Sequence, residues 1–370
     1  MDDDLKIGPQ WRVMLADARS LADAYGWNPI SDEVTPLGGA VNGVARIPTN
    51  IGDFVVRVHR PWTGPARLTA VHAVQDRLRK LGIPIPPVVA TSAGQTFVTI
   101  PGDPDATPGF EHDRLVEVME AVIADSTEET RDRADLVLAM LAPLHNALAA
   151  IDPASVPQPS YAAHVDVREA IAWLDGTDTA FATCASHPDF PRASAVRTIA
   201  RELIEGMRQD RLALEPHLPR QLVHGDLGFG NVLVRDGRVV AVLDFDFMAE
   251  RPRIFDLAYS LCHALTRLRS RHRNGVLAED ELSWFAGHVA AYSRAAHRPL
   301  TGPELDALPL EMVMVGLYQV AEAGFVANDP PRAIAQTLSI EHHLPLIAWL
   351  ADVPDQLTSA CRVAIGLSGA

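Results

Sequence analysis

The segment 223–246 constrains what this chain can fold into more than any other part of its sequence. It contains two apolar runs, 232–234 and 239–245, which are rich in β-branched residues and predict two short strands. Asp236 and Gly237 stand between the runs, and this pair is typical of a tight hairpin turn because Gly and Asp tolerate a positive φ. The segment therefore predicts a β-hairpin.

Polar residues lie at the ends of this predicted hairpin. Asn231 precedes the first strand and Asp244 lies near the end of the second, so the hairpin would place both side chains at one end. Oxygen atoms are the ligands that Mg²⁺ prefers, and Mg²⁺ in ATP sites takes one or two carboxylates together with substrate phosphates. Asp226 precedes the hairpin on a loop with Gly228 and Gly230, where the backbone can come close to a substrate. The pattern indicates a metal site beside a carboxylate that could orient a hydroxyl group. The alternative is that His224 and Asp226 only cap and pin a buried turn.

This segment resembles the catalytic and metal-binding loops of the aminoglycoside phosphotransferase and homoserine/choline kinase-like superfamily. Its members are distant relatives of protein kinases, which carry a similar His-x-Asp-x₄-Asn loop followed by a metal-binding Asp. The resemblance implies that Asp226 is the catalytic base, that Asn231 and Asp244 are Mg²⁺ ligands, and that His224 supports the loop. It also implies that Asp256, at the start of the next helix, buttresses the loop without taking part in the chemistry.

The same resemblance assigns a nucleotide-covering loop to the N-terminal part of the chain. Gly38 and Gly39 form a Gly pair between two β-prone runs, and Asn42 follows them. Backbone amides of such a loop can approach phosphates. The resemblance therefore implies that Gly38, Gly39 and Asn42 bind the nucleotide.

A second group of expected nucleotide-binding residues lies on two strands. Arg57, in a predicted strand 54–60, stands where protein kinases carry the Lys that pairs the nucleotide phosphates. Arg can clamp phosphate oxygens bidentately, although a solvated Arg on a strand face is the alternative. Glu117 and Met119, in the strand that enters the hinge of the family, are expected to bind adenine through backbone groups.

One feature departs from the family pattern. The predicted helix 66–81 corresponds to the helix that usually carries a Glu paired with the strand cation, but it contains no Glu. His72, Gln75 and Asp76 are the only candidates in it to replace that Glu, so the positioning of Arg57 is left open.

This departure leaves a second hypothesis open, a nucleotide-binding pseudokinase with a regulatory role. The presence of Asp226, Asn231 and Asp244 together favours an enzyme, because metal ligands have no purpose in an inactive fold. A third hypothesis is a metal-dependent hydrolase that uses His224 and Asp226, but the sequence around them lacks the further His ligands that such sites need.

Composition excludes several other classes of protein. The chain has 370 residues, of which 48% are hydrophobic and 21% charged, as expected of a soluble globular protein. A formal net charge of −15 argues against a general nucleic-acid binder and is compatible with a cationic substrate. The densest apolar stretch, 308–326, is interrupted by Glu311 and Glu322, so no membrane partner is expected. An acidic N-terminus without a signal peptide and three scattered cysteines predict a cytoplasmic protein.

The expected fold is α+β, in the two-lobed form of protein kinases. Residues 1–119 would form a nucleotide-binding lobe with a small antiparallel sheet, and residues 120–370 a mainly helical lobe with the catalytic loop and the acceptor site. By the resemblance, ATP (or GTP) would bind between the lobes with Mg²⁺. Its γ-phosphate would go to a hydroxyl of a small molecule, either an antibiotic such as an aminoglycoside or macrolide, or a hydroxylated metabolite.

Overall fold

The computed structural model forms two compact units, each described by itself. The described residues are 21–28, 35–38, 42–59, 63–102, 113–125, 128–159, 170–269, 279–322, 329–341, 343–352 and 354–367. The first unit is Met1–Asp125 with Ala154–Tyr161 and Val240–Leu243, and the second contains the rest of the chain. The predicted boundary after residue 119 falls inside the first unit, at the end of a strand.

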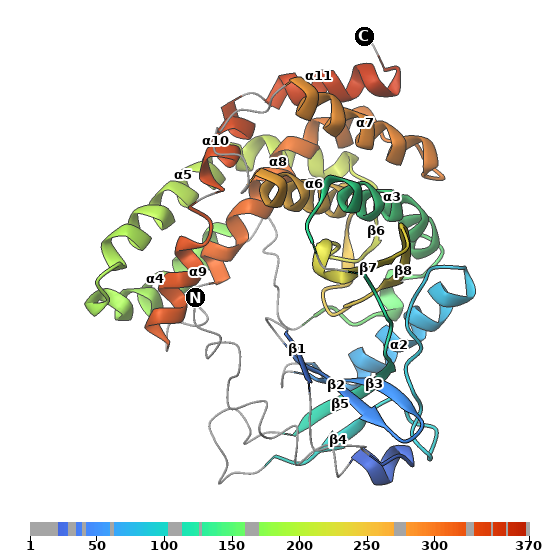
Figure 1. Ribbon diagram of the computed structural model, residues 1–370. Coiled ribbons are helices and arrows are strands. Elements are labelled where there is room, and N and C mark those ends of the chain that lie inside the picture. Colours follow the sequence, from blue (N-terminus) through green and yellow to red (C-terminus); the bar gives the residue numbers. More distant parts are fainter. Residues whose placement is uncertain are drawn as a thin grey trace. The chain divides into compact units, whose positions relative to one another are not determined.

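The first unit is built on a five-stranded antiparallel sheet (Figure 1). Its strand order is β1-β2-β3-β5-β4. The strands are β1 (Thr35–Gly38), β2 (Gly43–Thr49), β3 (Gly52–Val58), β4 (Val98–Ile100) and β5 (Arg114–Glu120). One helix of this unit, α2 (Pro65–Lys80), begins with a proline in its first turn, where the missing N–H costs no hydrogen bond. These elements agree with the strand and helix predicted around Arg57 and His72.

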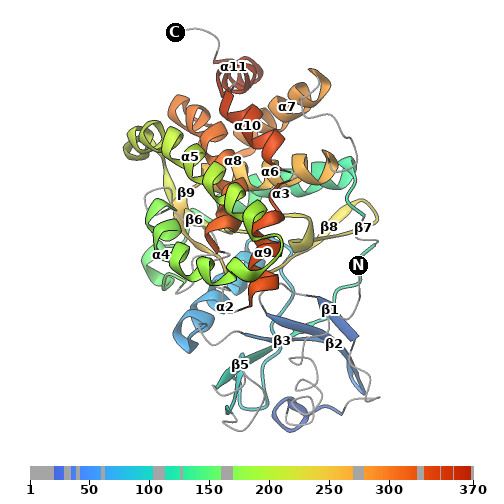
Figure 2. The same ribbon diagram turned by 90° about the vertical axis from the view of Figure 1, so that its left-hand side faces the viewer.

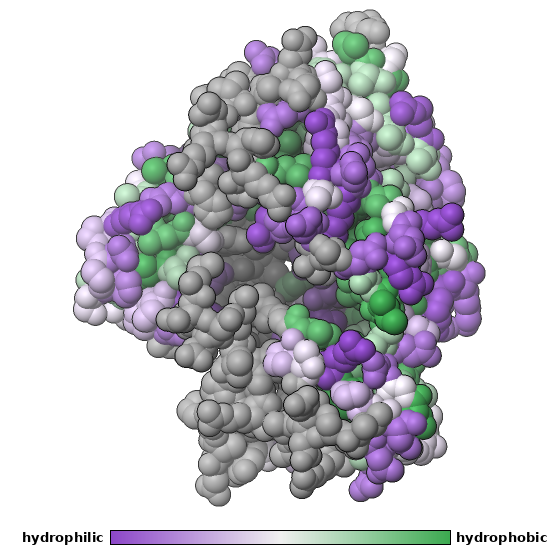
Figure 3. Space-filling model, viewed as in Figure 1, coloured by the Kyte–Doolittle hydropathy of each residue, from purple (hydrophilic) through white to green (hydrophobic). Residues whose placement is uncertain are grey.

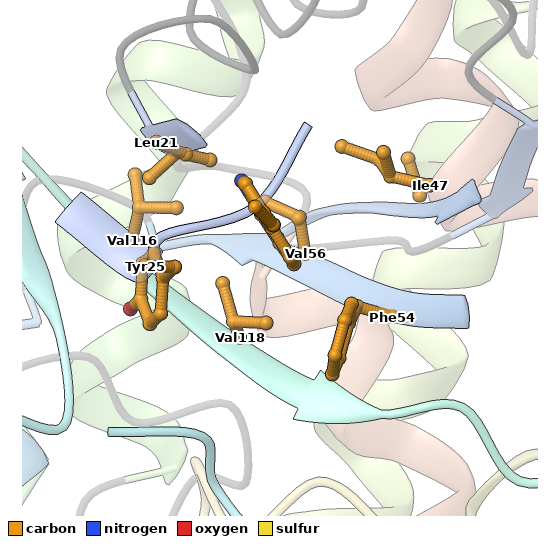
Figure 4. Close-up of a cluster of buried hydrophobic side chains, with 9 residues drawn as sticks. Leu21, Tyr25, Ile47, Phe54, Val56, Val116 and Val118 are labelled. Carbon is orange, nitrogen blue, oxygen red and sulfur yellow. The ribbon is translucent and has the colours of Figure 1, made fainter. Parts of the chain in front are cut away.

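Alternation along the strands gives the sheet one apolar face (Figure 4). Phe54 and Val56 point to this face and pack with Val116 and Val118 of the neighbouring strand. Leu21, Tyr25 and Trp27 cover them from the preceding segment. Because successive residues of a strand point to opposite faces, Arg57 lies on the other face of the sheet.

The second unit is mainly helical (Figures 1 and 2). Its helices are α3 (Arg131–Leu148), α4 (Ala170–Ala182), α5 (Phe190–Leu214), α6 (Ile254–Arg269), α7 (Glu279–Ala295), α8 (Gly302–Glu322), α9 (Pro330–Leu338), α10 (Leu344–Asp352) and α11 (Pro354–Ile365). Helix α6 packs against α8 and α3, and α7 packs against α11 and α3. The α+β architecture predicted from the sequence, with an antiparallel sheet first and a helical part after it, is confirmed.

Short strands carry the segment that the sequence singled out. Strands β6 (Arg220–Val223) and β9 (Ala249–Pro252) pair antiparallel, and β7 (Val232–Arg235) pairs with β8 (Arg238–Val242) in the predicted hairpin. Asp236 and Gly237 have φ values of 51° and 69°, as this turn requires. The second strand was predicted to reach Phe245 but ends at Val242, because Asp244 takes a left-handed φ of 62° that a strand cannot continue through.

On the face seen in Figure 3, hydrophilic residues of the described part of the chain are interspersed with hydrophobic ones, which is usual for globular proteins. Within the described part of the chain, no helix combines the length and the apolarity that crossing a membrane requires.

Candidate active site

The loop between β6 and β7 carries the predicted catalytic carboxylate. The side chain of Asn231 donates to the backbone oxygen of Asp226 at 2.8 Å and to its carboxylate Oδ2 at 2.9 Å. The hydroxyl of Tyr259, on α6, donates to Oδ1 of the same carboxylate. Donors therefore hold both oxygens of Asp226 in place, while the residue itself stays partly exposed.

The charge around Asp226 fits a cation site. Desolvation and then the nearby negative charge of Asp244 raise the pKa of Asp226 to about 7, although the hydrogen bonds from Tyr259 and Asn231 oppose this rise. Two carboxylates that repel each other in this way would both be stabilised by a divalent cation. The donor set of the predicted site is therefore consistent with Mg²⁺.

The predicted metal ligands have suitable atoms on offer. Asn231 uses its amide nitrogen to bind Asp226, so its Oδ1 lies on the other side of the amide and can ligate a cation. Asp244 and Asn231 are both partly exposed, whereas the supporting residues His224 and Asp256 are buried. Among the described residues no group of three or more His, Cys, Asp or Glu could hold a metal.

Asp256 supports the loop from below, as predicted. Its carboxylate is completely buried and accepts the backbone N–H groups of His224 at 2.6 Å and Gly225 at 2.8 Å. Burial alone would raise the pKa of Asp256, but His145, at 3.0 Å, and the other partners lower it below its usual value. Asp256 is thus a charged anchor for the backbone of the β6–β7 loop.

Two further residues shape the start of the loop. His224 is buried, and its Nδ1 accepts the backbone N–H of Asp226 at 3.2 Å, which confirms its predicted supporting role. Gly225 has a φ of +85°, and a Cβ at this position would lie 2.4 Å from the backbone oxygen of Phe247. Only glycine can occupy this position without moving the backbone.

Sequence reasoning missed two residues that contact the loop. Arg133, on α3, is buried and donates to the backbone oxygens of Phe229 at 2.7 Å and Val232 at 3.2 Å, on either side of Asn231. Nothing in the sequence links it to a loop almost a hundred residues away. Tyr259 could have been found, because it follows Asp256 by three residues on a helix and so shares its face.

In the first unit, strand register aligns several of the predicted nucleotide-binding residues. Gly38 of β1 pairs with Val44 of β2, Val44 pairs with Arg57 of β3, and Arg57 pairs with Glu117 of β5. Asn42 lies just before β2, at the same end of the strand as Val44, and is buried. Gly39 lies outside the described residues. The row places Gly38, the last residue of β1, on the same line across the sheet as Arg57.

Glu117 supplies the carboxylate beside Arg57 that helix α2, which has no Glu, does not supply. Its Oε1 lies 3.6 Å from Nη1 of Arg57 and 3.2 Å from Nε2 of His59. Its Oε2 lies 2.5 Å from Nε2 of His72, on α2. Arg57 thus has a buried carboxylate beside it, supplied by a strand.

The backbone around Glu117 and Met119 is engaged within the sheet. Met119 pairs with Val55 of β3 on one side and forms an isolated bridge with Val88 on the other. The backbone oxygen of Val118 accepts from Val89 at 2.8 Å. Backbone groups of β5 in this region are thus paired with neighbouring segments on both sides of the strand. Adenine binding at Glu117 and Met119 stays a prediction.

A family model described as "Phosphotransferase enzyme family" matches residues 33–300. The comparison with curated proteins gives no match.

Solved structures show a similar fold over nearly the whole chain. A microcompartment-associated aminopropanol kinase is 19% identical, with a TM-score of 0.64 and coverage of 93% of this chain and 98% of that one. An amicoumacin kinase in complex with AMP-PNP, Ca²⁺ and Ami is 15% identical, with a TM-score of 0.60 and 95% of both chains covered. Plasmodium vivax ethanolamine kinase is 12% identical, with a TM-score of 0.58 and coverage of 92% and 90%. At such identities the likeness establishes the kinase-like fold, as predicted.

Proposed function

The chain belongs to the phosphotransferase enzyme family, and we propose that this small-molecule kinase transfers the γ-phosphate of ATP to a hydroxyl group of its substrate. One observation carries the proposal. Asp226 presents a partly exposed carboxylate that Asn231 and Tyr259 hold from both oxygens, beside the negative charge of Asp244. This arrangement suits a group that must orient an alcohol next to a metal-bound phosphate.

Three polar residues would have separate tasks in this reaction. Asp226 would accept or orient the proton of the acceptor hydroxyl as its oxygen attacks the γ-phosphorus in line. Asn231 and Asp244 would hold Mg²⁺, which when bound neutralises charge on the phosphates. Phosphoryl transfer depends mainly on positioning and charge neutralisation, so the buried residues His224, Gly225 and Asp256 would contribute by holding the base in place.

We propose a small amino alcohol as the acceptor class to test first. Aminopropanol and ethanolamine, named in two of the similar solved structures, combine a hydroxyl with an amine. The net charge of −15 is compatible with a cationic substrate. An antibiotic acceptor is the second class, in line with the amicoumacin kinase structure.

Calorimetry followed by an acceptor screen tests this function. The purified protein is titrated with ATP and with GTP, each with and without Mg²⁺, and then incubated with MgATP and a panel of amino alcohols and antibiotics. We expect nucleotide binding that strengthens with Mg²⁺, and a phosphorylated product from one acceptor class. Metal-dependent binding without any product from a broad hydroxyl panel would favour the pseudokinase, and no nucleotide binding would exclude both.

A further inference from the structure

The polar face of the sheet in the first unit carries a buried cluster of charged and nitrogen-bearing side chains. Here Glu117 is 2% exposed, and three nitrogen-bearing side chains surround its carboxylate. Arg57 lies in β3, His59 directly follows β3, and His72 lies in α2. The Nδ1 atom of His72 lies 2.7 Å from the hydroxyl of Thr96, which fixes the orientation of the ring.

The carboxylate of Glu117 is charged in this setting. Burial alone would raise its pKa, but His59, His72 and Arg57 together hold the pKa of Glu117 well below its usual range. A buried negative charge of this kind needs its partners, and they need it in return. Glu117 and Arg57 are therefore a coupled pair.

Strand register determines the geometry of this pair. Arg57 and Glu117 are direct partners in the β3–β5 ladder, so their side chains leave the same face of the sheet at adjacent positions. In protein kinases the corresponding strand cation is paired by a glutamate from a helix. Here the helix contributes His72, and the carboxylate comes from the sheet itself.

We propose that Glu117 is a positioning residue that aims Arg57 at the phosphates of the bound nucleotide, and that the sheet holds this pair without a carboxylate from α2. The inference rests on the proposed function. Arg57 is itself only 5% exposed, so its position depends on the groups packed around it. A guanidinium carries five N–H donors, which is more than one carboxylate accepts. The alignment of Arg57 with Gly38 and Val44 puts it in the row that reaches the end of β1.

A double-mutant cycle on ATP affinity tests the proposal. The dissociation constant of ATP in the presence of Mg²⁺ is measured by calorimetry for wild type, Glu117→Gln, Arg57→Met and the double variant. If Glu117 acts through Arg57, each single variant weakens binding by roughly 10-fold and the double variant by about the same factor. Independent effects that multiply to about 100-fold in the double variant would overturn the proposal.

Two matched variants separate the sheet pair from its surroundings. His72→Gln removes the contact from α2 and leaves Arg57 and Glu117 paired, so we expect it to weaken ATP binding less than Glu117→Gln. Asp53→Asn removes a carboxylate that pairs with Arg46 at the far end of the β2–β3 hairpin, and should leave ATP affinity unchanged. A loss of affinity in His72→Gln as large as that in Glu117→Gln would contradict the independence from α2.

Folding is checked by thermal melting of each variant. Should Glu117→Gln be unfolded at the assay temperature, the same cycle is run with Glu117→Asp, which retains the charge at a greater distance. A folded Glu117 variant that binds ATP like wild type overturns this inference alone. Wild type that fails to bind ATP overturns the proposed function, and this inference with it.

Discussion

Two buried or partly buried aspartates near the catalytic loop behave in opposite ways. Asp226 faces the like charge of Asp244, which adds to desolvation and raises its pKa to about 7. Asp256 instead accepts two backbone N–H groups and contacts His145, and its pKa is lowered. Opposite pKa shifts of this kind fit the proposed division of roles, with a catalytic base at Asp226 and a structural anchor at Asp256.

The lowered pKa of Asp256 gives a prediction for stability at low pH. An unfolded Asp titrates near ~3.9, so a lower folded value means that the charge of Asp256 stabilises the fold fully above about pH 4 and less as the pH falls through the folded pKa. Asp256→Asn should destabilise the protein by about 2 kcal/mol or more at pH 7, because it breaks a buried charged network. Urea unfolding across a pH series should show this difference shrinking below about pH 4.

The matched control is Asp210→Asn, an exposed carboxylate on α5 whose loss removes the same charge. It should change the urea midpoint little at any pH. If the difference in free energy of unfolding between wild type and Asp256→Asn stays the same down to pH ~3, the charge of Asp256 is not the cause of that difference.

At the level of elements, the loop is held by helices that are distant in sequence. Helix α6 supplies Asp256 and Tyr259, and α3 supplies Arg133. The hairpin and the helix were predictable because turn residues and apolar periodicity are local signals. The end of β8 was mispredicted, because an apolar run does not reveal that Asp244 turns into the left-handed region.

Arg133 offers a prediction about the metal site. Its guanidinium donates to the backbone oxygens of Phe229 and Val232, on either side of Asn231. Replacing a residue that supports a metal ligand from behind typically lowers the metal affinity by about 10- to 100-fold. Arg133→Lys keeps the charge but loses the planar fork. We expect the Mg²⁺ concentration for half-maximal phosphate transfer to rise by roughly 10-fold, with activity partly restored at high Mg²⁺.

Arg131→Lys is the control on the same helix, since Arg131 is exposed and lies over the ring of Trp284. Its Mg²⁺ dependence should match that of wild type. Equal Mg²⁺ dependence in Arg133→Lys would mean that α3 does not position Asn231.

For the whole molecule, features that depend on nearby residues could be predicted from the sequence, whereas contacts between residues far apart in the chain could not. The motif around Asp226 lies within one short segment, so its turn residues and apolar runs were sufficient to predict the hairpin. The supporting role of Asp256 and the α+β fold were predicted from the family resemblance that this motif carries. Arg57 and Glu117 were each named from the sequence, but 60 positions separate them and only the strand register reveals that they face each other. The cytoplasmic location and the binding of adenine at β5 stay predictions.

The same pairing bears on the pseudokinase hypothesis. That hypothesis arose because the helix 66–81 has no glutamate to pair with Arg57. Glu117 lies 3.6 Å from the Arg57 guanidinium, so a missing counter-ion is no longer a reason to expect an inactive protein.

The most direct test of the account is phosphate transfer by Asp226→Asn, measured with MgATP and the acceptor that the screen identifies. We predict that turnover falls by a factor on the order of 10³, as for loss of a general base. The melting temperature should not fall, because the substitution removes the repulsion with Asp244. Asp236→Asn, at the exposed hairpin turn, should keep wild-type turnover. Turnover by folded Asp226→Asn within a few-fold of wild type would contradict the assignment of this loop as the catalytic centre.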